Sequence, residues 1–276
     1  MKKNTVLFLI ILTSFKLSSQ VKKQIDKSKY RAIYSYQFQR DSLDTSNVKI
    51  EEMELLIGKD ISLFQSLNFK FNDSLRFSNK DKINSITDVQ SIMSERKKAY
   101  IKYKIVKHKK HITVYEDFLL SKFKYNEKVN LKWQILNDTL TINSYKCNKA
   151  TTNYSGREYI AWFTKEIPIS NGPYKFTGLP GLIIKIYDTK NQHLFKLNSF
   201  TKKSVPIILY NQLNTRQNVT KKQYYDAIKK YKKDPMYYHV TVAHAIPNER
   251  DNQNTRNFLL KHAKRFKANE IELKIE

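Results

Sequence analysis

Apolar and polar residues alternate along much of this 276-residue chain, and the alternation predicts β-strands. From Tyr30 to Gln39 every second residue is apolar or aromatic, which is the period of a half-buried strand. A second strand is expected over 52–57, and the polar residues 58–60 turn it into a third over 61–64 as a hairpin. Further short strands recur at intervals of roughly ten residues, which is typical of a large antiparallel sheet. They are expected at 100–105, 111–115, 129–135, 139–142, 145–152, 158–164, 182–187 and 194–197, with polar turns at 137–138 and 188–191.

Helical spacing replaces this alternation in a few places. The polar stretch 72–98 carries apolar residues at intervals of three or four, which favours one amphipathic helix. These residues are Ile83, Ile86, Val89 and Met93. Later in the chain, Thr220 can cap a helix that ends before Asp234, and another helix is expected over 254–266. The predicted fold class is therefore α+β and mainly β, with one large, curved, half-barrel-like antiparallel sheet and a few helices.

The first residues read as a secretory signal peptide. Lys2 and Lys3 form a basic start, and the apolar run 6–12 is too short to make a stable membrane span. Small polar residues follow, and we expect cleavage after Ser19, which leaves Gln20 as the first mature residue. An uncleaved N-terminal anchor is the alternative.

The remainder of the chain shows no internal repeat and no linker rich in glycine and serine. We therefore expect residues 1–19 to be the signal peptide and residues 20–276 to form a single domain. No second apolar run approaches membrane length, so the mature chain is expected to be periplasmic or secreted and to lack a transmembrane span.

Glycine and proline are concentrated in the stretch 156–181. It holds four of the five glycines and three of the six prolines of the chain. Glycine permits backbone conformations and close approaches that other residues resist, whereas proline fixes one dihedral angle. The backbone path there must therefore be specific. The residues expected to shape it are Gly156, Gly172, Pro173, Gly178, Leu179, Pro180 and Gly181.

The chain is strongly basic, with 51 Lys and Arg against 25 Asp and Glu and a formal net charge of +26. This balance predicts salt-sensitive attraction to anionic surfaces such as lipopolysaccharide. A solvated lysine-rich surface without a dedicated partner is the alternative. Lysine and tyrosine mix at 221–225 and 231–233, a pattern that can stack on single-stranded bases. Export argues against nucleic acid as a partner.

Two histidine pairs are the candidates for a metal site. His108 and His111 are three residues apart in a strand-and-turn region, and no third ligand lies nearby. His239 and His244 are five apart and would lie on opposite faces of a strand. Because zinc sites need three or four protein ligands, neither pair predicts a metal.

No established catalytic motif is present. Glu158 and Glu166 would lie about 26 Å apart in an extended segment, too far to act as an acid–base pair. Cys147 is the single cysteine, which excludes an intramolecular disulfide and leaves a buried apolar residue or a reactive thiol as alternatives. The sequence predicts no cofactor, and it leaves open whether the protein is an enzyme.

Residues 178–183 read GLPGLI, which matches letter for letter the motif of the GLPGLI family of exported Bacteroidetes proteins. Other parts resemble further pieces of that pattern, with Tyr174 where Trp is usual and Glu270 where Pro is usual. These pieces lie at 133–135, 145–147, 149–151, 156–164, 167–169, 172–176 and 269–273. The resemblance covers nearly the whole mature chain. It implies export and a shared fold, but it supplies no catalytic residues, because the family has no established activity.

Three functional hypotheses follow. The first is a non-enzymatic envelope protein that binds a protein or an anionic glycolipid, with a turn in the Gly/Pro stretch presenting aromatic side chains. The candidate binding residues are Arg157, Trp162, Tyr174 and Phe176. The second is a hydrolase or peptidase-like enzyme with an unfamiliar site at Arg157, Glu158 and Asp188. In the third, the motif is purely structural and the function lies elsewhere on the sheet.

Overall fold

A computed structural model describes most of the chain. The described residues are 21–42, 44–109, 111–119, 121–211, 216–236, 257, 259–261, 263 and 269–274. The expected signal peptide and the histidines at 239 and 244 lie outside them. Most of the helix expected over 254–266 also lies outside the described residues. Within it, residues 257, 259–261 and 263 are described and are helical.

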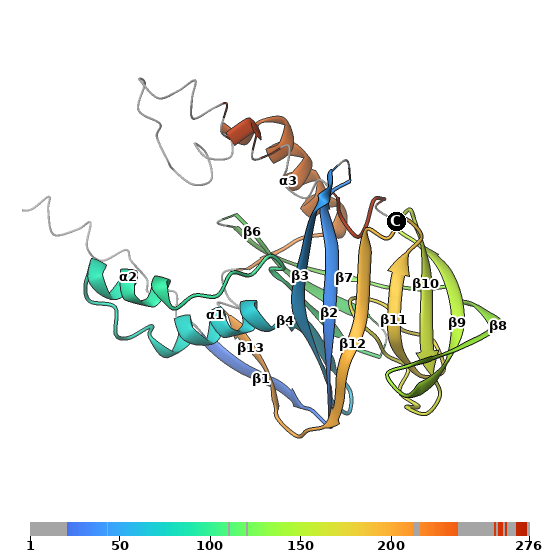
Figure 1. Ribbon diagram of the computed structural model, residues 1–276. Coiled ribbons are helices and arrows are strands. Elements are labelled where there is room, and N and C mark those ends of the chain that lie inside the picture. The colour runs from blue at the N-terminus through green and yellow to red at the C-terminus, as the bar shows by residue number, and fades with distance from the viewer. Residues whose placement is uncertain are drawn as a thin grey trace, which may run out of the picture.

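Twelve strands form one open, curved sheet, which confirms the predicted fold class (Figure 1). Their order across the sheet is β14-β7-β6-β5-β4-β3-β2-β12-β11-β10-β9-β8. All neighbours run antiparallel except β14, which is parallel to β7. The strands are β2 (Tyr30–Asp41), β3 (Asp44–Ile57), β4 (Ser62–Ser66), β5 (Tyr103–Lys107), β6 (Ile112–Phe118), β7 (Ser121–Glu127), β8 (Gln134–Ile142), β9 (Tyr145–Tyr154), β10 (Arg157–Thr164), β11 (Leu182–Asp188), β12 (His193–Lys202) and β14 (Gln217–Asn218).

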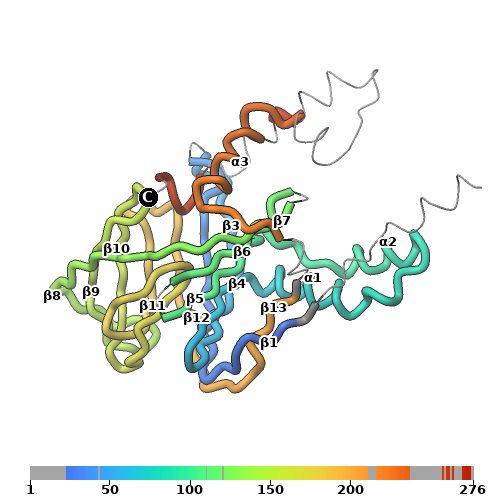
Figure 2. Tube along the Cα trace, turned by 180° about the vertical axis from the view of Figure 1, so that it is seen from behind, coloured from blue at the N-terminus to red at the C-terminus, as the bar shows by residue number. Residues whose placement is uncertain are grey.

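The sheet consists of two antiparallel meanders that meet at one pair of strands. Strands β2 to β7 are neighbours in chain order on one side, and strands β12 back to β8 are neighbours on the other. The two halves join where β2 pairs with β12, from the pair Phe38 and His193 to the pair Tyr30 and Lys202. The β8–β12 half curls round, so that the sheet encloses a concave face (Figures 1 and 2).

The concave face holds the main hydrophobic core, in which side chains from both meanders pack together. Fully buried members from the two halves include Tyr34 and Phe64 on one side and Phe163 and Phe195 on the other. A smaller apolar cluster lies on the opposite face of β3–β6, where a separate two-stranded ribbon packs. The ribbon pairs β1 (Val21–Lys27) with β13 (Pro206–Asn211).

Three helices of the described part of the chain, α1 to α3, lie beside the β2–β7 half of the sheet (Figures 1 and 2). The helix α1 (Leu67–Ser78) begins at the cap Ser66, whose side chain accepts a hydrogen bond from the backbone of Phe69. The helix α2 (Ile86–Ser94) starts with a capping box and extends away from the β8–β12 half in both views (Figures 1 and 2). The helix α3 (Lys221–Lys233) is capped by Thr220, as expected, and buries Tyr224 and Tyr231 against the core.

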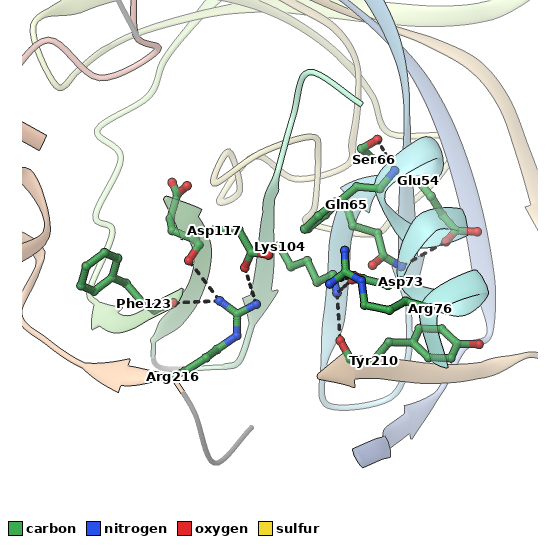
Figure 3. A network of polar contacts seen from close by, with 12 residues as sticks. Glu54, Gln65, Ser66, Asp73, Arg76, Lys104, Asp117, Phe123, Tyr210 and Arg216 are labelled. Carbon is green, nitrogen blue, oxygen red and sulfur yellow. Dashed lines mark hydrogen bonds and ion pairs between the residues drawn. The ribbon is translucent and has the colours of Figure 1, made fainter. Parts of the chain in front are cut away.

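Ion pairs fix α1 to the sheet. Asp73 on α1 pairs with the buried Lys104 of β5, and Lys70 on α1 reaches Glu54 of β3 at 2.7 Å. Lys104 also donates to the backbone carbonyl of Tyr210 on β13 at 3.3 Å. Figure 3 shows these groups converging between helix, sheet and ribbon. The helix α1 is therefore held by charge-assisted bonds in addition to apolar packing.

Some sequence predictions were wrong in detail. The turn expected at 137–138 is an irregularity inside β8, which continues to Ile142 after a shift of register between Ile135 and Thr139. The expected strand over 129–135 starts only at residue 134. The helix α1 was not expected, because its start, LNFKF, alternates like a strand. The helix expected within 72–98 is confirmed as α2.

Candidate functional site

The Gly/Pro stretch bridges the two meanders. Between β10 and β11 the chain crosses the concave face to reach β4 and β5. There the side chain of Asn171 donates to the hydroxyl of Ser62 at 3.0 Å, and Lys107 donates to the carbonyl of Gly172 at 2.5 Å. The segment returns through a bridge between Asn171 and Leu182, the first residue of β11. It therefore ties together strands that are far apart in the order of the sheet.

Two glycines explain why this path needs its unusual composition. A Cβ atom on Gly181 would collide with the backbone carbonyl oxygen of Thr164, so no other residue fits without a shift of the backbone. Gly178 has a φ of +99°, which side-chain-bearing residues rarely adopt, although a Cβ there would make only ordinary van der Waals contact with the ring of Trp133 at 3.6 Å. One position is thus restricted by close approach and the other by backbone conformation.

Arg157 links this region to the last described residues. Its guanidinium pairs with Asp188 at 3.0 Å and donates to Gln192 at 2.8 Å. It also donates to the side-chain oxygen of Asn269. Two of its N–H groups donate to the carbonyl of Glu270, at 3.1 Å from Nε and 2.7 Å from Nη2. With 5% of its surface exposed, Arg157 acts as an internal clamp on residues 269–273, which we call the C-terminal strap.

Glu272 of the strap enters a buried cluster of charges. Its carboxylate pairs with Lys175 and with Lys221, and it accepts hydrogen bonds from the hydroxyls of Tyr154 and Tyr174. Burial alone would raise the pKa of Glu272, but the two ammonium groups outweigh that effect and lower the pKa to about 2. The cluster joins the Gly/Pro stretch, α3 and the strap.

This geometry changes how the candidate binding residues are interpreted. Tyr174 and Phe176 are buried in the core, so the expectation that a turn presents their rings to a partner is wrong. Trp162 is half-buried, and the ammonium of Lys149 lies 6.0 Å from its ring centroid. Whether Arg157, Trp162 or the two buried rings contact a partner stays a prediction.

The residues of the hydrolase hypothesis do not converge on one pocket. Arg157 and Asp188 form their ion pair in the interior. Glu158 is exposed, because alternate residues of β10 point to opposite faces of the sheet. Cys147 is buried as well, and burial raises the pKa of its thiol to about 11, which makes a reactive thiolate unfavourable.

An open cleft of about 420 Å³ lies beside the Gly/Pro stretch. It is bounded by the β3–β4 turn, the β5–β6 turn and the start of the crossing segment. Its described lining residues are 57–62, 107–109, 111, 112, 129, 169–171 and 177. His108 and His111 line it with stacked rings whose centroids are 4.3 Å apart. Partial burial lowers the pKa of His108, and the neighbouring His111 lowers it further.

Sequence reasoning did not identify Lys107, which lines this cleft with only 6% of its surface exposed. Its ammonium donates to the side-chain oxygen of Asn171 at 2.9 Å and to the carbonyls of Gly172 and Phe176 at 2.5 and 3.5 Å. Burial lowers the pKa of Lys107 to about 7. In the sequence Lys107 ends an ordinary alternating strand, so nothing local marks it.

Comparisons with known proteins support the fold and leave the activity open. A family model described as "Protein of unknown function (Porph_ging)" matches residues 154–185, the segment that contains β10 and the Gly/Pro crossing. No curated protein matches the chain.

Two solved structures are similar. "Structure of PNGF-II in P21 space group" is 14% identical with a TM-score of 0.50, and the match covers 75% of this chain and 34% of that chain. "Structure of PNGF-II in C2 space group" is 15% identical with a TM-score of 0.48, and covers 75% and 33%. The chain thus spans about a third of the length of the solved chains, and the first likeness concerns the fold alone.

Proposed function

We propose that the protein is an exported, non-enzymatic envelope protein that binds an anionic glycolipid surface through α2. Export rests on the signal peptide expected over residues 1–19. The observation that supports the glycolipid surface is that α2 buries none of its residues, although its composition is amphipathic. A helix that packs on its own protein normally buries its apolar stripe.

The apolar side chains at α2 face solvent to an unusual degree. Ile86 is 73% exposed, Met93 is 57% exposed and the preceding Ile83 is 45% exposed. Transfer of such side chains out of water contributes about 0.8 kcal/mol for each methylene buried. An amphipathic helix that lies in a membrane interface gains this energy without crossing the bilayer. In the described part of the chain, no helix has the length and apolar character needed to cross one.

Basic residues flank the same helix. Residues 80–98 contain five Lys and Arg against three Asp and Glu. The basic residues are Lys80, Lys82, Arg96, Lys97 and Lys98. Each lysine near an anionic surface contributes about 1 kcal/mol. Charge and apolar surface therefore favour the same partner, an anionic lipid headgroup layer.

The segment that follows α2 is fixed to the rest of the protein by hydrogen bonds. The side chain of Asn72 on α1 donates to the carbonyl of Lys97 at 2.7 Å and accepts from its backbone amide at 2.9 Å. Glu51 of β3 holds the next part of the connection, by accepting from the amides of Tyr100 and Ile101. The segment after α2 is thus attached to α1 and the sheet, so binding through α2 would carry the whole domain to the surface.

Co-sedimentation with vesicles tests this proposal. The protein is expected to bind vesicles that carry lipopolysaccharide or phosphatidylglycerol, and to bind pure phosphatidylcholine weakly. Ile86→Ser combined with Met93→Ser should reduce the affinity about tenfold or more, because most of the insertable apolar surface is removed. Lys97→Gln combined with Lys98→Gln should reduce it by a similar factor.

Matched controls use exposed positions outside α2. Ile50→Ser removes another exposed apolar side chain, which is 62% exposed on β3. Lys190→Gln with Lys203→Gln removes two exposed charges elsewhere. These variants should bind vesicles like the wild type. Equal loss of binding in the control and α2 variants would contradict the proposal, as would an unaltered affinity in the α2 variants.

A further inference from the structure

One buried lysine differs from the other buried cations of the described residues in the charge of its partners. Five Lys and Arg residues are buried in the described part of the chain. Four of them pair with a carboxylate: Lys104 with Asp73, Arg157 with Asp188, Lys175 with Glu127 and Glu272, and Arg216 with Asp117. Lys107 is the fifth, and its described partners are the neutral oxygens of Asn171, Gly172 and Phe176.

A buried ammonium without a counter-charge is costly, because its loss of hydration is not offset by an opposite charge. Buried ionisable groups of this kind that line a cleft are concentrated at functional sites. Three hydrogen-bond acceptors hold Lys107 in place, but they carry no net charge. The bond to the carbonyl of Phe176, at 3.5 Å, is the weakest of the three, so its N–H is the one that another acceptor can take most easily.

The position of Lys107 provides access. It lines the open cleft of about 420 Å³, which is large enough for a small ligand. Other groups around the cleft carry positive charge or hydrogen-bond donors. They are Lys59, His108, Lys109, His111, Ser62, Ser170 and Asn171. Asp60 is the acidic residue among the lining side chains, and Lys109 already pairs with it at 2.9 Å.

Asn171 connects the buried lysine to Ser62 on the neighbouring strand. Its side-chain oxygen accepts from Lys107, and its side-chain amide donates to the hydroxyl of Ser62. Ser62 and Lys107 are also directly opposite each other in the pairing of β4 with β5, so their side chains share one face of the sheet. The lysine, the amide and the hydroxyl therefore form one continuous polar group at the cleft.

We propose that this cleft binds a phosphate or carboxylate group of a small polar molecule, with Lys107 as the counter-charge and Ser62 and Asn171 as hydrogen-bonding partners. The inference is independent of membrane binding by α2, which lies on a different part of the chain. The same oxyanion can come from a free metabolite or from a lipid headgroup.

Binding of an anion next to Lys107 should stabilise the charged amine. Because the pKa of this lysine is about 7 without a neighbouring negative charge, ligand binding near pH 8 should take up a proton. Below about pH 6 the amine is already charged, and the uptake through Lys107 should vanish. Lys59, Lys109 and His111 also face the cleft, together with His108 and Asp60. The pKa values of His108 and Asp60 are lowered from ordinary values that already lie below 7, so these two groups take up little proton near pH 8.

Isothermal titration calorimetry tests the proposal with inorganic phosphate, glucose 6-phosphate and glucuronate, and with glucose as the uncharged control. The anionic probes should bind and glucose should not. Lys107→Met should weaken the binding of the anions at least about tenfold, because a charge-assisted bond is lost. Lys190→Met, which removes an exposed lysine in the β11–β12 turn, should have no effect.

Vesicles that carry phosphatidic acid form a second arm, measured in a protein that already bears the two serine substitutions in α2. Binding of free glucose 6-phosphate supports a soluble ligand, and binding only of the lipid-borne phosphate supports a headgroup. Both support the oxyanion site, provided that Lys107→Met removes them.

The wild-type protein supplies a test that does not depend on folding of the variant. Titrations near pH 8 in buffers of different ionisation enthalpy should report uptake of up to one proton per anion bound. Absence of binding by every anionic probe would overturn the proposal. Equal affinity for glucose and glucose 6-phosphate, or binding near pH 8 without proton uptake, would overturn it as well.

Discussion

Lys175 in the Gly/Pro stretch and Glu272 in the C-terminal strap form a buried ion pair between residues 97 positions apart in the sequence. Each of the two side chains is 1% exposed. Lys221 of α3 reaches the same carboxylate at 2.8 Å, and Tyr154 donates to it at 3.0 Å. One carboxylate thus connects β9, the crossing segment and α3.

Glu272→Gln is expected to lower the free energy of unfolding by about 3 kcal/mol, because it leaves Lys175 buried with less opposite charge. Urea denaturation followed by circular dichroism measures the change. Glu158→Gln, on the exposed side of β10, is the matched control and should change stability by less than about 0.5 kcal/mol. Similar effects of the two substitutions would show that the cluster contributes little.

The same carboxylate predicts a dependence on pH. The pKa of Glu272 is lowered to about 2 in the folded protein, from an ordinary value of 4.5. Its contribution to stability is therefore complete above pH 4.5 and is lost as the pH falls towards 2. The difference in stability between the wild type and Glu272→Gln should shrink over that interval. A difference that stays constant from pH 6 to pH 2 would contradict the assignment.

Lys107 predicts a second rise of stability with pH, in the neutral to alkaline range. Its pKa is lowered to about 7 from an ordinary 10.5, so between these values the unfolded chain holds a proton that the folded protein has released. The wild type should gain about 1.4 kcal/mol in free energy of unfolding for each pH unit across that window, relative to Lys107→Met. Paired denaturation curves between pH 6 and pH 10 measure this, and parallel curves would refute it.

Two alanine substitutions separate the two reasons for glycine in the crossing segment. Gly181→Ala should destabilise the protein by more than about 3 kcal/mol, because the new methyl group collides with the Thr164 carbonyl. Gly178→Ala would place its methyl group in ordinary van der Waals contact with Trp133 and should cost only about 1 kcal/mol, through its positive φ. Thermal or urea unfolding ranks the two, and a larger loss at Gly178 would reverse the interpretation.

Processing at the N-terminus gives a prediction from the sequence alone. After export the mature protein should begin at Gln20, which N-terminal sequencing or intact-mass spectrometry can determine. Detection of residues 1–19 on protein recovered from the envelope fraction would instead favour an uncleaved anchor. The mature protein should be found in the periplasmic or secreted material.

Much of the fold could be predicted from the sequence, because a half-buried strand has a local period of two. The pattern from Tyr30 onward, the hairpin around Gly58 and the cap at Thr220 are local signals, and the structure contains each of them. The helix α1 was missed because its first residues alternate as those of a strand would. Its packing against β3 and β4, which the local sequence does not reveal, favours the helix.

The site could be predicted less well, because its contacts are not local. Lys104 is a polar position of the strand expected over 100–105, and Lys107 lies beyond that strand. Both are nevertheless buried, on opposite faces of the sheet, against Asp73 and against Asn171. Arg157 is a candidate binding residue in the sequence, a role that stays a prediction, and its structural partners in the strap lie 112 and 113 positions further on. No pattern within a few residues carries that information.

The C-terminal strap also constrains the order in which the chain can fold. When Lys175 leaves the ribosome, 97 more residues must follow before Glu272 can neutralise it. Contacts of such long sequence separation form slowly, because a large loop must close first. Until then the crossing segment can be held by Glu127 and Lys107, but it lacks its contact with the strap. The nascent protein is therefore incompletely folded for a long interval, during which chaperones and proteases can bind it.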